Sequence, residues 1–399
     1  MWLCHAWLGM LRAMHSNDYQ MIDTDEGLSA LCRRLQDETW IAVDTEFMRE
    51  STYFPKLCLL QVATADISAC IDILAIKELA PLTDLLYNED ILKVMHAARQ
   101  DLEIFFHMRG TVPKPVFDTQ LAAPLLGYPE QAGYAALVEA FLGVHLSKAH
   151  TRTDWSQRPL SAAQLQYAAD DVRYLARLYP MLRDRLAQSN RLTWLTDDFA
   201  SLMDASEYER PPDQAWLRVK GVQQVRGHRL ATLQALAAWR ELTARKADRP
   251  RNWLLRDEHI LDLAKLQPAD KTALSRIRGV NAQILHKYAD ELLDIIKTAK
   301  TQTPVTIPSE RTTSRLDSGQ EAIIDLLLTT IRVLAGRHDV NPAIITTRKE
   351  LERLIQGDET VKVLQGWRRK LAGETLLAVL HGKFALQISA DTVQLIEKA

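Results

Sequence analysis

The sequence predicts an α/β domain with a mixed sheet, followed by two small all-helical domains. From about residue 22 to 188, short β-rich runs alternate with amphipathic helical segments. After about residue 208 the strand patterns end, and helical segments are joined by proline-bearing connections. The chain has 399 residues, 47% of them hydrophobic and 25% charged, which is enough for two or three domains with cores of their own.

The elements of the α/β part follow from their periodicity. The predicted strands are WIAVDTEF (40–47), KLCLLQVAT (56–64), SACIDIL (68–74), LKVMHA (92–97) and a short PVFDTQ (115–120). The predicted helices are 76–90, 97–109, 119–127 and 161–187, the last of which begins at a serine cap. Strands alternating with helices indicate an α/β architecture.

The helical part contains a weak internal repeat at an offset of 92 residues. Arg240 matches Arg332, Pro250 matches Pro342 and Arg256 matches Arg348, and the polar run TQTPVTIPSERTTS separates the two copies. We therefore expect an N-terminal extension, an α/β domain, a first helical domain, a linker and a second helical domain. Their expected bounds are 1–20, 21–190, 208–300, 301–314 and 315–399.

Several classes of protein are excluded by composition. No apolar run reaches the roughly 20 residues of a membrane helix, and the first fourteen residues lack the basic start and cleavage site of a signal peptide. The cysteines (Cys4, Cys32, Cys58, Cys70) show no metal-binding or disulfide spacing, which indicates a reduced, cytoplasmic protein without membrane contact. The phosphate-binding pattern G-x-x-x-x-G-K-[ST] is absent, so we expect no nucleotide cofactor.

Acidic residues recur at three places that suit catalysis. Asp44 and Glu46 lie two apart on the first predicted strand, so their side chains point to the same face. Asp101 lies near the start of a helix that follows a strand. Tyr167 and Asp171 are four apart on the last helix and share one side of it, as Asp170 also can.

Four carboxylates and a tyrosine suit two hard divalent cations, Mg²⁺ or Mn²⁺. Such ions take oxygen ligands, and a pair of them roughly 3.5–4 Å apart is the usual arrangement for phosphodiester cleavage. The tyrosine hydroxyl is expected to orient the attacking water. The pattern predicts hydrolysis of one nucleotide at a time from a free end.

Three motifs carry a resemblance to a known family. VDTEF, HAARQDLE and YAADD resemble, in order and spacing, the exonuclease motifs of the tyrosine-bearing branch of the DEDD superfamily. The runs FMRESTYFPKLCLLQVAT and DWSQRPLSAAQLQYAADDVRYL look like bacterial ribonuclease D, and LAAWRELTARKADRPRNWLLRDEHILDLAKLQP resembles a helical HRDC domain. The resemblance implies a ribonuclease H-like fold, divalent-metal dependence and 3′-to-5′ removal of nucleotides from RNA, including trimming of precursor tRNA 3′ ends.

The resemblance also implies roles for individual residues. Metal-ligand places fall on Asp44, Glu46, Asp101 and Asp171, and the water-orienting place falls on Tyr167; the neighbouring Asp170 leaves the fourth ligand open. Candidate substrate-binding residues are Arg49, Tyr53, Lys56, His96, Lys148 and Arg158, with Arg152 in the same loop as the last two. Each assignment has an alternative. Arg49, Tyr53 and Lys56 could instead support their loop, and His96 could be a core histidine. The loop that carries Lys148, Arg152 and Arg158 could simply be solvated.

The distribution of positive charge along the chain indicates the binding partner. Residues 210 to 256 carry eleven basic side chains against three acidic ones, and such a band attracts a polyanionic backbone. We expect RNA partners, especially tRNA precursors and small structured RNAs with free 3′ ends. The alternatives are a DNA 3′-to-5′ exonuclease, since the metals act on the phosphodiester, and a non-catalytic RNA-binding protein.

Overall fold

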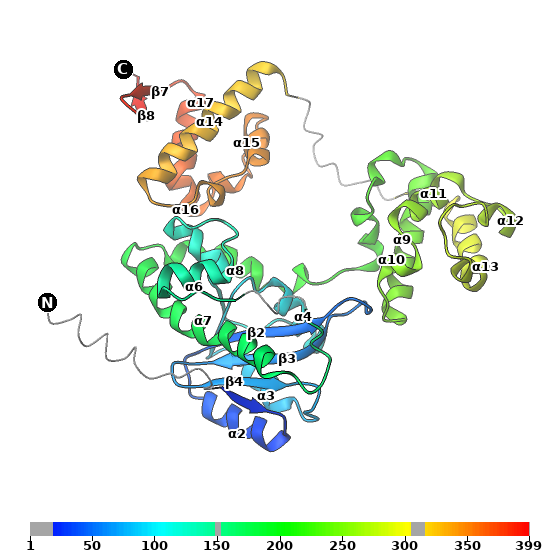
Figure 1. Cartoon of the computed structure of the whole chain (residues 1–399). Coiled ribbons are helices and arrows are strands. Elements are labelled where there is room, and N and C mark those ends of the chain that lie inside the picture. Colours follow the sequence, from blue (N-terminus) through cyan, green and yellow to red (C-terminus); the bar gives the residue numbers. More distant parts are fainter. Residues whose placement is uncertain (1–18, 148–152, 305–315, 399) are drawn as a thin grey trace.

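The computed structural model describes residues 19–147, 153–304 and 316–398, which form an α/β domain and two helical modules (Figure 1). The strands of the α/β domain are β1 (Gln20–Ile22), β2 (Trp40–Met48), β3 (Lys56–Ala63), β4 (Ser68–Asp72), β5 (Leu92–Met95) and β6 (Val116–Asp118). Its helices are α2 (Asp25–Leu35), α3 (Ala80–Leu86), α4 (Arg99–Arg109), α5 (Thr119–Ala122), α6 (Tyr134–Leu142) and α7 (Ala162–Gln188).

The six strands form one mixed sheet in the order β1-β4-β3-β2-β5-β6. Strands β2, β3 and β4 are antiparallel neighbours, whereas β1 runs parallel to β4, and β5 runs parallel to both β2 and β6. Strand β1 was not predicted, and Gln20, which pairs with Ala69, lies inside the expected N-terminal extension. The rest of that extension, apart from Tyr19, lies outside the described residues.

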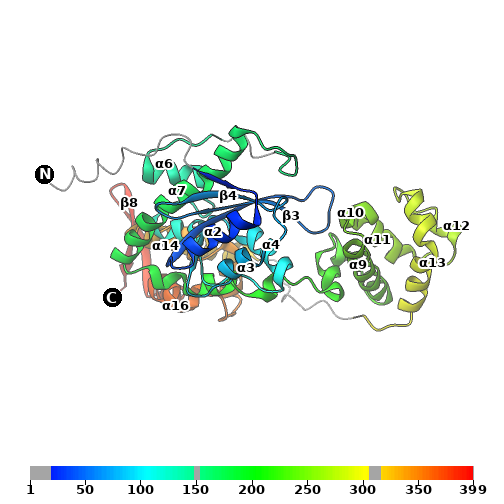
Figure 2. The ribbon, with the colours of Figure 1, turned by 90° about the horizontal axis from the view of Figure 1, so that it is seen from below.

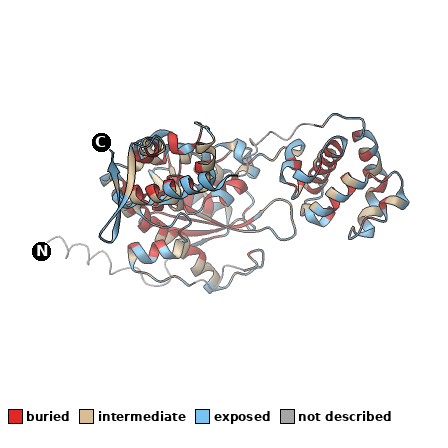
Figure 3. Ribbon diagram, turned by 90° about the horizontal axis from the view of Figure 1, so that it is seen from above, coloured by how far each residue is buried: buried red, intermediate tan, exposed pale blue. Residues whose placement is uncertain are grey.

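The two faces of the sheet are buried by different helices. Ile41 and Val43 pack with Leu28 of α2 and Leu82 of α3 on one face. Ala42, between them on the strand, packs with Val172 of α7 on the other. Burial on both faces explains why the strands are almost continuously apolar, and the buried residues of Figure 3 follow the sheet accordingly. Any polar side chain on the α7 face is therefore held between sheet and helix.

A connecting segment with η2 (Leu192–Leu195), α8 (Thr196–Leu202) and η3 (Ala205–Glu207) leads to the first helical module, whose first element is η4 (Pro212–Arg218), and Tyr208 just before it still packs in the core of the α/β domain. The elements of this module are η4 (Pro212–Arg218), η5 (Val222–Gln224), α9 (His228–Lys246), α10 (Arg251–Leu254), α11 (Asp257–Leu266), α12 (Lys271–Leu274) and α13 (Ala282–Ala299). Its core, centred on Leu233, Leu236 and Leu263, is separate from the core of the α/β domain.

The second helical module, residues 316–398, has its own core around Leu327, Leu351 and Leu376. Its elements are α14 (Ser318–Arg337), η6 (Pro342–Ile344), α15 (Arg348–Ile355), η7 (Lys362–Leu364), α16 (Gly366–Arg368), η8 (Arg369–Gly373), α17 (Glu374–Leu380), β7 (Phe384–Ser389) and β8 (Thr392–Glu397). The hairpin β7–β8 corrects the expectation that strands end near residue 208: alternating apolar residues place Leu386 opposite Leu395.

The internal repeat corresponds to matching elements. Shifting α9 by 92 residues places it on α14, and Pro250 and Pro342 both stand at the start of the short helix that follows. Arg256 precedes α11 as Arg348 begins α15. The same order of elements in both modules supports a duplication.

The two modules contact different parts of the α/β domain, as Figures 1 and 2 show. The second module stacks Trp367 on Trp194, with ring centroids 4.6 Å apart, and Arg368 pairs with Asp198 at 3.0 Å. The first module is contacted by the loop between β2 and β3. Among the described residues, no helix is long and apolar enough to cross a membrane.

Candidate active site

Strand β2 supplies two of the predicted acidic residues. Asp44 and Glu46 share the strand face of Ala42, which is the face covered by α7. Asp171 projects from α7, so the helix that buries this face also brings the third carboxylate. Oxygens of Asp44, Glu46 and Asp171 all lie within 4.8 Å of one another. The structure thus gathers side chains from positions 127 residues apart (171 minus 44) into one cluster.

Three half-buried carboxylates this close together repel one another, and burial together with this repulsion raises their pKa values. Burial, followed by the charges of Asp44, Asp171 and Asp101, raises the pKa of Glu46 to about 10. Burial and the charge of Asp170 raise the pKa of Asp171 to about 7, and burial and Asp171 raise the pKa of Asp44 well above its usual range. Without a cation the cluster therefore retains protons near neutral pH.

The donor set fits hard divalent cations. All the ligand atoms are carboxylate oxygens, which Mg²⁺ and Mn²⁺ prefer, and no thiol or imidazole belongs to this cluster of described residues. A divalent cation would replace the repulsion between the carboxylates with attraction. Asp44, Glu46 and Asp171 are the residues that would hold it.

Asp101 reaches the same region from helix α4. It is 6% exposed, and the Thr45 hydroxyl, between Asp44 and Glu46 on β2, donates a hydrogen bond to its carboxylate. Burial and the charge of Asp44 raise the pKa of Asp101 well above its usual range. Asp101 is outside the group of three but is electrostatically part of the same site.

The start of α4 is fixed by the buried carboxylate of Asp118. Asp118 caps α5, accepting from the Gln120 backbone N–H at 2.7 Å. It also accepts from the backbone N–H groups of Ala97 at 3.0 Å and Ala98 at 2.9 Å. Ala97 has a φ of 56°, a left-handed conformation that these bonds hold in place. Asp118 thereby positions the helix that carries Asp101.

The two adjacent acids on α7 have different surroundings. Asp171 belongs to the carboxylate cluster. Asp170 instead accepts hydrogen bonds from Gln166 at 2.9 Å and from Arg173. Tyr167 lies one turn before Asp171 on α7, half-buried, with its ring 6.2 Å from that of Trp155.

Tyr134 is a neighbour of the site that the sequence did not reveal. Its hydroxyl donates to the backbone carbonyl of Asp170 at 3.0 Å, and its ring lies 5.5 Å from that of His96. Burial, then the charges of Asp171 and Asp44, raises the pKa of Tyr134 well above its usual range. Nothing in the surrounding YPEQAGYAAL marks this tyrosine, since its place depends on how α6 packs on α7.

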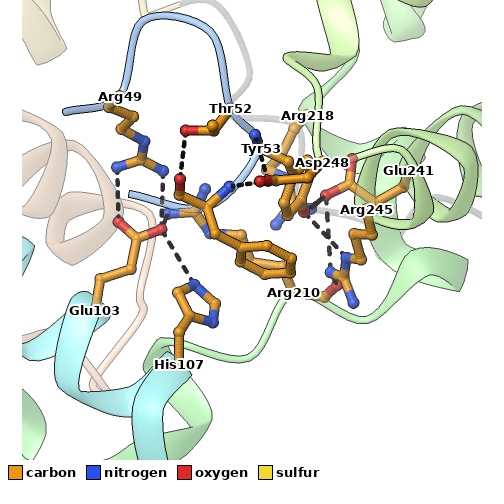
Figure 4. Close-up of polar contacts among 11 residues, drawn as sticks. Arg49, Thr52, Tyr53, Glu103, His107, Arg210, Arg218, Glu241, Arg245 and Asp248 are labelled. Carbon is orange, nitrogen blue, oxygen red and sulfur yellow. Dashed lines mark hydrogen bonds and ion pairs between the residues drawn. The ribbon is translucent and has the colours of Figure 1, made fainter. Parts of the chain in front are cut away.

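Of the predicted substrate-binding residues, Arg49 and Tyr53 have partners within the protein (Figure 4). Arg49 forms a two-pronged ion pair with Glu103 of α4, both contacts being 2.9 Å. The Tyr53 hydroxyl donates to Glu241 of α9, and its backbone N–H donates to Asp248 at 3.0 Å. These contacts tie the β2–β3 loop to the first helical module and give both side chains a structural role besides the predicted one.

The other predicted substrate-binding residues are more scattered. Arg158 is held by Asp72, with contacts of 2.6 and 2.7 Å, so its guanidinium serves the fold. His96 contacts the Thr119 hydroxyl at 2.9 Å, and burial lowers its pKa to about 4, as expected for a neutral core histidine. Lys56 is exposed at the start of β3, whereas Lys148, with Arg152, lies outside the described residues.

Comparison with known proteins identifies the class. A family model described as 3′-5′ exonuclease matches residues 19–187, and an HRDC domain model matches residues 229–296. Ribonuclease D of Acidiphilium cryptum is 40% identical over 383 residues, covering 94% of this chain and 97% of that protein. Ribonuclease D of Granulibacter bethesdensis is 38% identical over 380 residues, covering 94% and 96%.

Solved structures agree. Escherichia coli RNase D, described as an exoribonuclease involved in structured RNA processing, superposes with a TM-score of 0.80 at 30% identity over 92% of this chain and 99% of that one. The catalytic core of RRP6 from Trypanosoma brucei gives a TM-score of 0.56 at 25% identity, covering 73% and 84%. Fold, site and matches together define a 3′–5′ exoribonuclease with a C-terminal HRDC domain. The chain belongs to the ribonuclease D family. The predicted fold class and enzyme class are confirmed.

Proposed function

We propose that this exoribonuclease depends on two divalent cations, Mg²⁺ or Mn²⁺, held by Asp44, Glu46, Asp101 and Asp171. The observation that carries the proposal is the meeting of the Asp44, Glu46 and Asp171 carboxylates within 4.8 Å. Like charges this close are unfavourable without a cation between them. Paired cations activate water and stabilise the leaving oxygen in such hydrolases.

The remaining steps fall to the protein's own side chains. Asp118 fixes the start of α4, so Asp101 keeps its place beside β2. Tyr167 is on the same side of α7 as Asp171, and we assign its hydroxyl the orientation of the attacking water at the 3′-terminal phosphodiester. Repetition of the step removes nucleotides one by one as 5′-mononucleotides.

We further propose structured RNAs as substrates, including tRNA precursors. Escherichia coli RNase D is described as processing structured RNA, and this chain covers 99% of that structure. Of the eleven basic side chains of residues 210–256, several are paired within the protein and are therefore less available to RNA. Arg210 pairs with Glu103, Arg218 and Arg245 pair with Glu241, and Arg240 is buried beside Asp257. Exposed cations that remain available to phosphates include Lys220, Arg226, Arg229, Lys246 and Arg249.

The metal mechanism is tested by Asp44→Asn. This variant keeps the size of the side chain and removes one charge, so 3′-to-5′ degradation should fall by at least about 10³-fold while RNA binding stays within about twofold. Hydrolysis of 5′-labelled RNA and filter binding measure the two quantities. Full activity in the variant, or in parent protein with excess chelator, contradicts the proposal. Matched RNA and DNA oligonucleotides test the alternative of a DNA exonuclease.

The fourth ligand is tested by the adjacent pair on α7. Asp171→Asn should abolish hydrolysis as Asp44→Asn does, because Asp171 is in the carboxylate cluster. Asp170→Asn should retain most activity, because Asp170 pairs with Arg173. Equal loss in both variants would contradict the assignment.

A further inference from the structure

Strand β3 contains one polar side chain in its apolar interior, Gln61. It is fully buried (0% exposed), and its strand neighbours Leu60 and Val62 are buried as well. Within the described part of the chain, neither the amide nitrogen nor the amide oxygen of Gln61 has a hydrogen-bond partner. A buried carboxamide without a partner opposes folding, because folding removes it from water. An apolar side chain would be favoured here on packing grounds alone.

The sheet register places Gln61 beside the carboxylate cluster. Gln61 lies directly opposite Asp44 on β2 and opposite Cys70 on β4. Directly opposite residues of antiparallel strands point to the same face, with Cβ atoms about 4.5–5.5 Å apart. That face is the one under α7, because the Cys70 thiol contacts the Leu165 carbonyl of that helix at 3.8 Å. The Gln61 carboxamide is therefore on the same side of the sheet as the Asp44 carboxylate and within reach of it.

The other strand neighbours of the cluster offer no such group. Leu59, opposite Glu46, is apolar, and the pairing of β2 with β5 ends at Ala42. Gln61 is thus the polar cross-strand neighbour of Asp44 in the sheet.

We propose that Gln61 is a positioning residue for Asp44: once a divalent cation is bound, its amide N–H donates to the Asp44 carboxylate and fixes the orientation in which Asp44 holds the cation. This inference rests on the proposed metal site. Groups that orient metal ligands typically change metal affinity 10–100-fold when removed. The amide is not a catalytic residue, since it acts through Asp44.

The test compares Gln61→Met with Ser68→Ala in the full chain. Methionine matches glutamine in size and lacks the amide, and Gln61→Leu is a second apolar replacement. Ser68, on β4 opposite Ala63, is also buried with an unpartnered hydroxyl, but lies two strands from Asp44. Binding of Mn²⁺ alone, followed by electron paramagnetic resonance, gives the metal affinity, and thermal unfolding without metal gives the folded fraction.

We expect Gln61→Met to weaken Mn²⁺ binding at least tenfold while metal-free thermal unfolding is unchanged or shifted upward. Ser68→Ala should bind Mn²⁺ as the parent does. Parent-like Mn²⁺ affinity in either Gln61 variant, or failure of both to fold, overturns the role of Gln61. Absence of Mn²⁺ binding by the parent protein would instead overturn the proposed metal site.

Discussion

At the scale of single residues, the carboxylate cluster suits a bound cation but lowers the stability of the metal-free protein at neutral pH. Burial first, and neighbouring carboxylates next, raises the pKa values of Asp44 and Glu46. The pKa values of these acids are higher in the folded than in the unfolded protein. Their contribution to the stability of the metal-free protein is therefore fully present below the unfolded pKa, near 4, and is lost as the pH rises toward the folded pKa. Removing one acid should therefore stabilise the metal-free protein at neutral pH.

This gives a prediction for Asp44→Asn. Without metal, its free energy of unfolding should equal that of the parent near pH 4 and exceed it by about 1–3 kcal/mol at pH 8. Mg²⁺ should raise the melting temperature of the parent much more than that of the variant. Urea unfolding across this pH range measures the first difference, with the exposed Asp66→Asn as the control. A variant less stable than the parent at pH 8 would show that Asp44 has a structural partner.

Tyr167→Phe isolates the hydroxyl of the proposed water-orienting residue. The ring would keep its packing on Trp155, so stability and RNA affinity should stay within error of the parent values. The turnover number should fall by about 10²-fold or more, as is usual when a group that positions or receives a proton is lost. Single-turnover hydrolysis measures it. Tyr174→Phe, two turns further along α7, is the matched control and should be nearly neutral.

Residues of the site that are paired by local periodicity could be predicted from the sequence, whereas residues placed by tertiary packing could not. Asp44 with Glu46, and Tyr167 with Asp171, are paired by the local periods of strand and helix. Tyr134 and Gln61 lie beside the same cluster because of helix packing and sheet register, which no local pattern encodes. Arg49 and Arg158 carry the positive charge that phosphate binding needs. Their ion pairs with Glu103 and Asp72 form only in the folded chain, so the sequence did not reveal them.

At the scale of elements, the β2–β3 loop, helix α4 and the first helical module meet at Glu103. Although burial opposes its ionisation, the bonds and charges of His107, Arg49 and Arg210 lower the pKa of Glu103 to about 2. A lowered folded-state pKa gives stability that is present above the unfolded pKa, near 4.5, and lost as the pH falls toward 2. The Glu103 carboxylate links elements that are distant in the sequence (Figure 4).

Glu103→Gln should therefore lower the free energy of unfolding at pH 7 by about 1.5–3 kcal/mol, the range for hydrogen bonds to charged groups. The difference from the parent should shrink as the pH falls from 4.5 toward 2. Urea unfolding at several pH values measures it. Glu207→Gln is the control, because its ion pair with Arg99 is exposed and should contribute little. A pH-independent difference would assign the effect to packing instead of charge.

The elements themselves were predictable where the periodicity is long. Helix α7 and strands β2 to β5 follow from continuous patterns, as does the repeat of α9 in α14. Strand β1 spans only Gln20–Ile22 and owes its conformation to pairing with β4. The hairpin β7–β8 lies within residues 315–399, which were predicted to be helical, and its partly buried Phe384 and Leu395 are fixed by packing on the second module's core.

At the scale of the whole molecule, the arrangement of the modules depends on contacts that composition does not encode. The second module is seated by the Trp194–Trp367 stack, and Asn341 donates to the carbonyls of Pro124 and Tyr128 at 2.9 and 3.0 Å. The first module is seated by Tyr53 and Asp248. Deleting both modules would expose these interfaces, so a loss of RNA binding could come from lost contacts to RNA or from lost structure. The contribution of the positive charges to RNA binding is therefore better tested by substitutions in the intact chain.

The exposed cations of the first module are expected to bind the RNA backbone at a distance from the carboxylate cluster. Replacing Arg229, Lys246 and Arg249 together by alanine should weaken binding of a structured RNA and reduce the slope of log affinity against log salt by about 2, because each phosphate contact contributes about 0.7–0.9. A short unstructured oligonucleotide, which needs only the active site, should be cut at nearly the parent rate. Removing three exposed cations of the α/β domain instead, Arg33, Arg34 and Lys77, is the matched control and should leave the slope unchanged. If both triple variants lose affinity equally, net charge and not the first module guides the RNA.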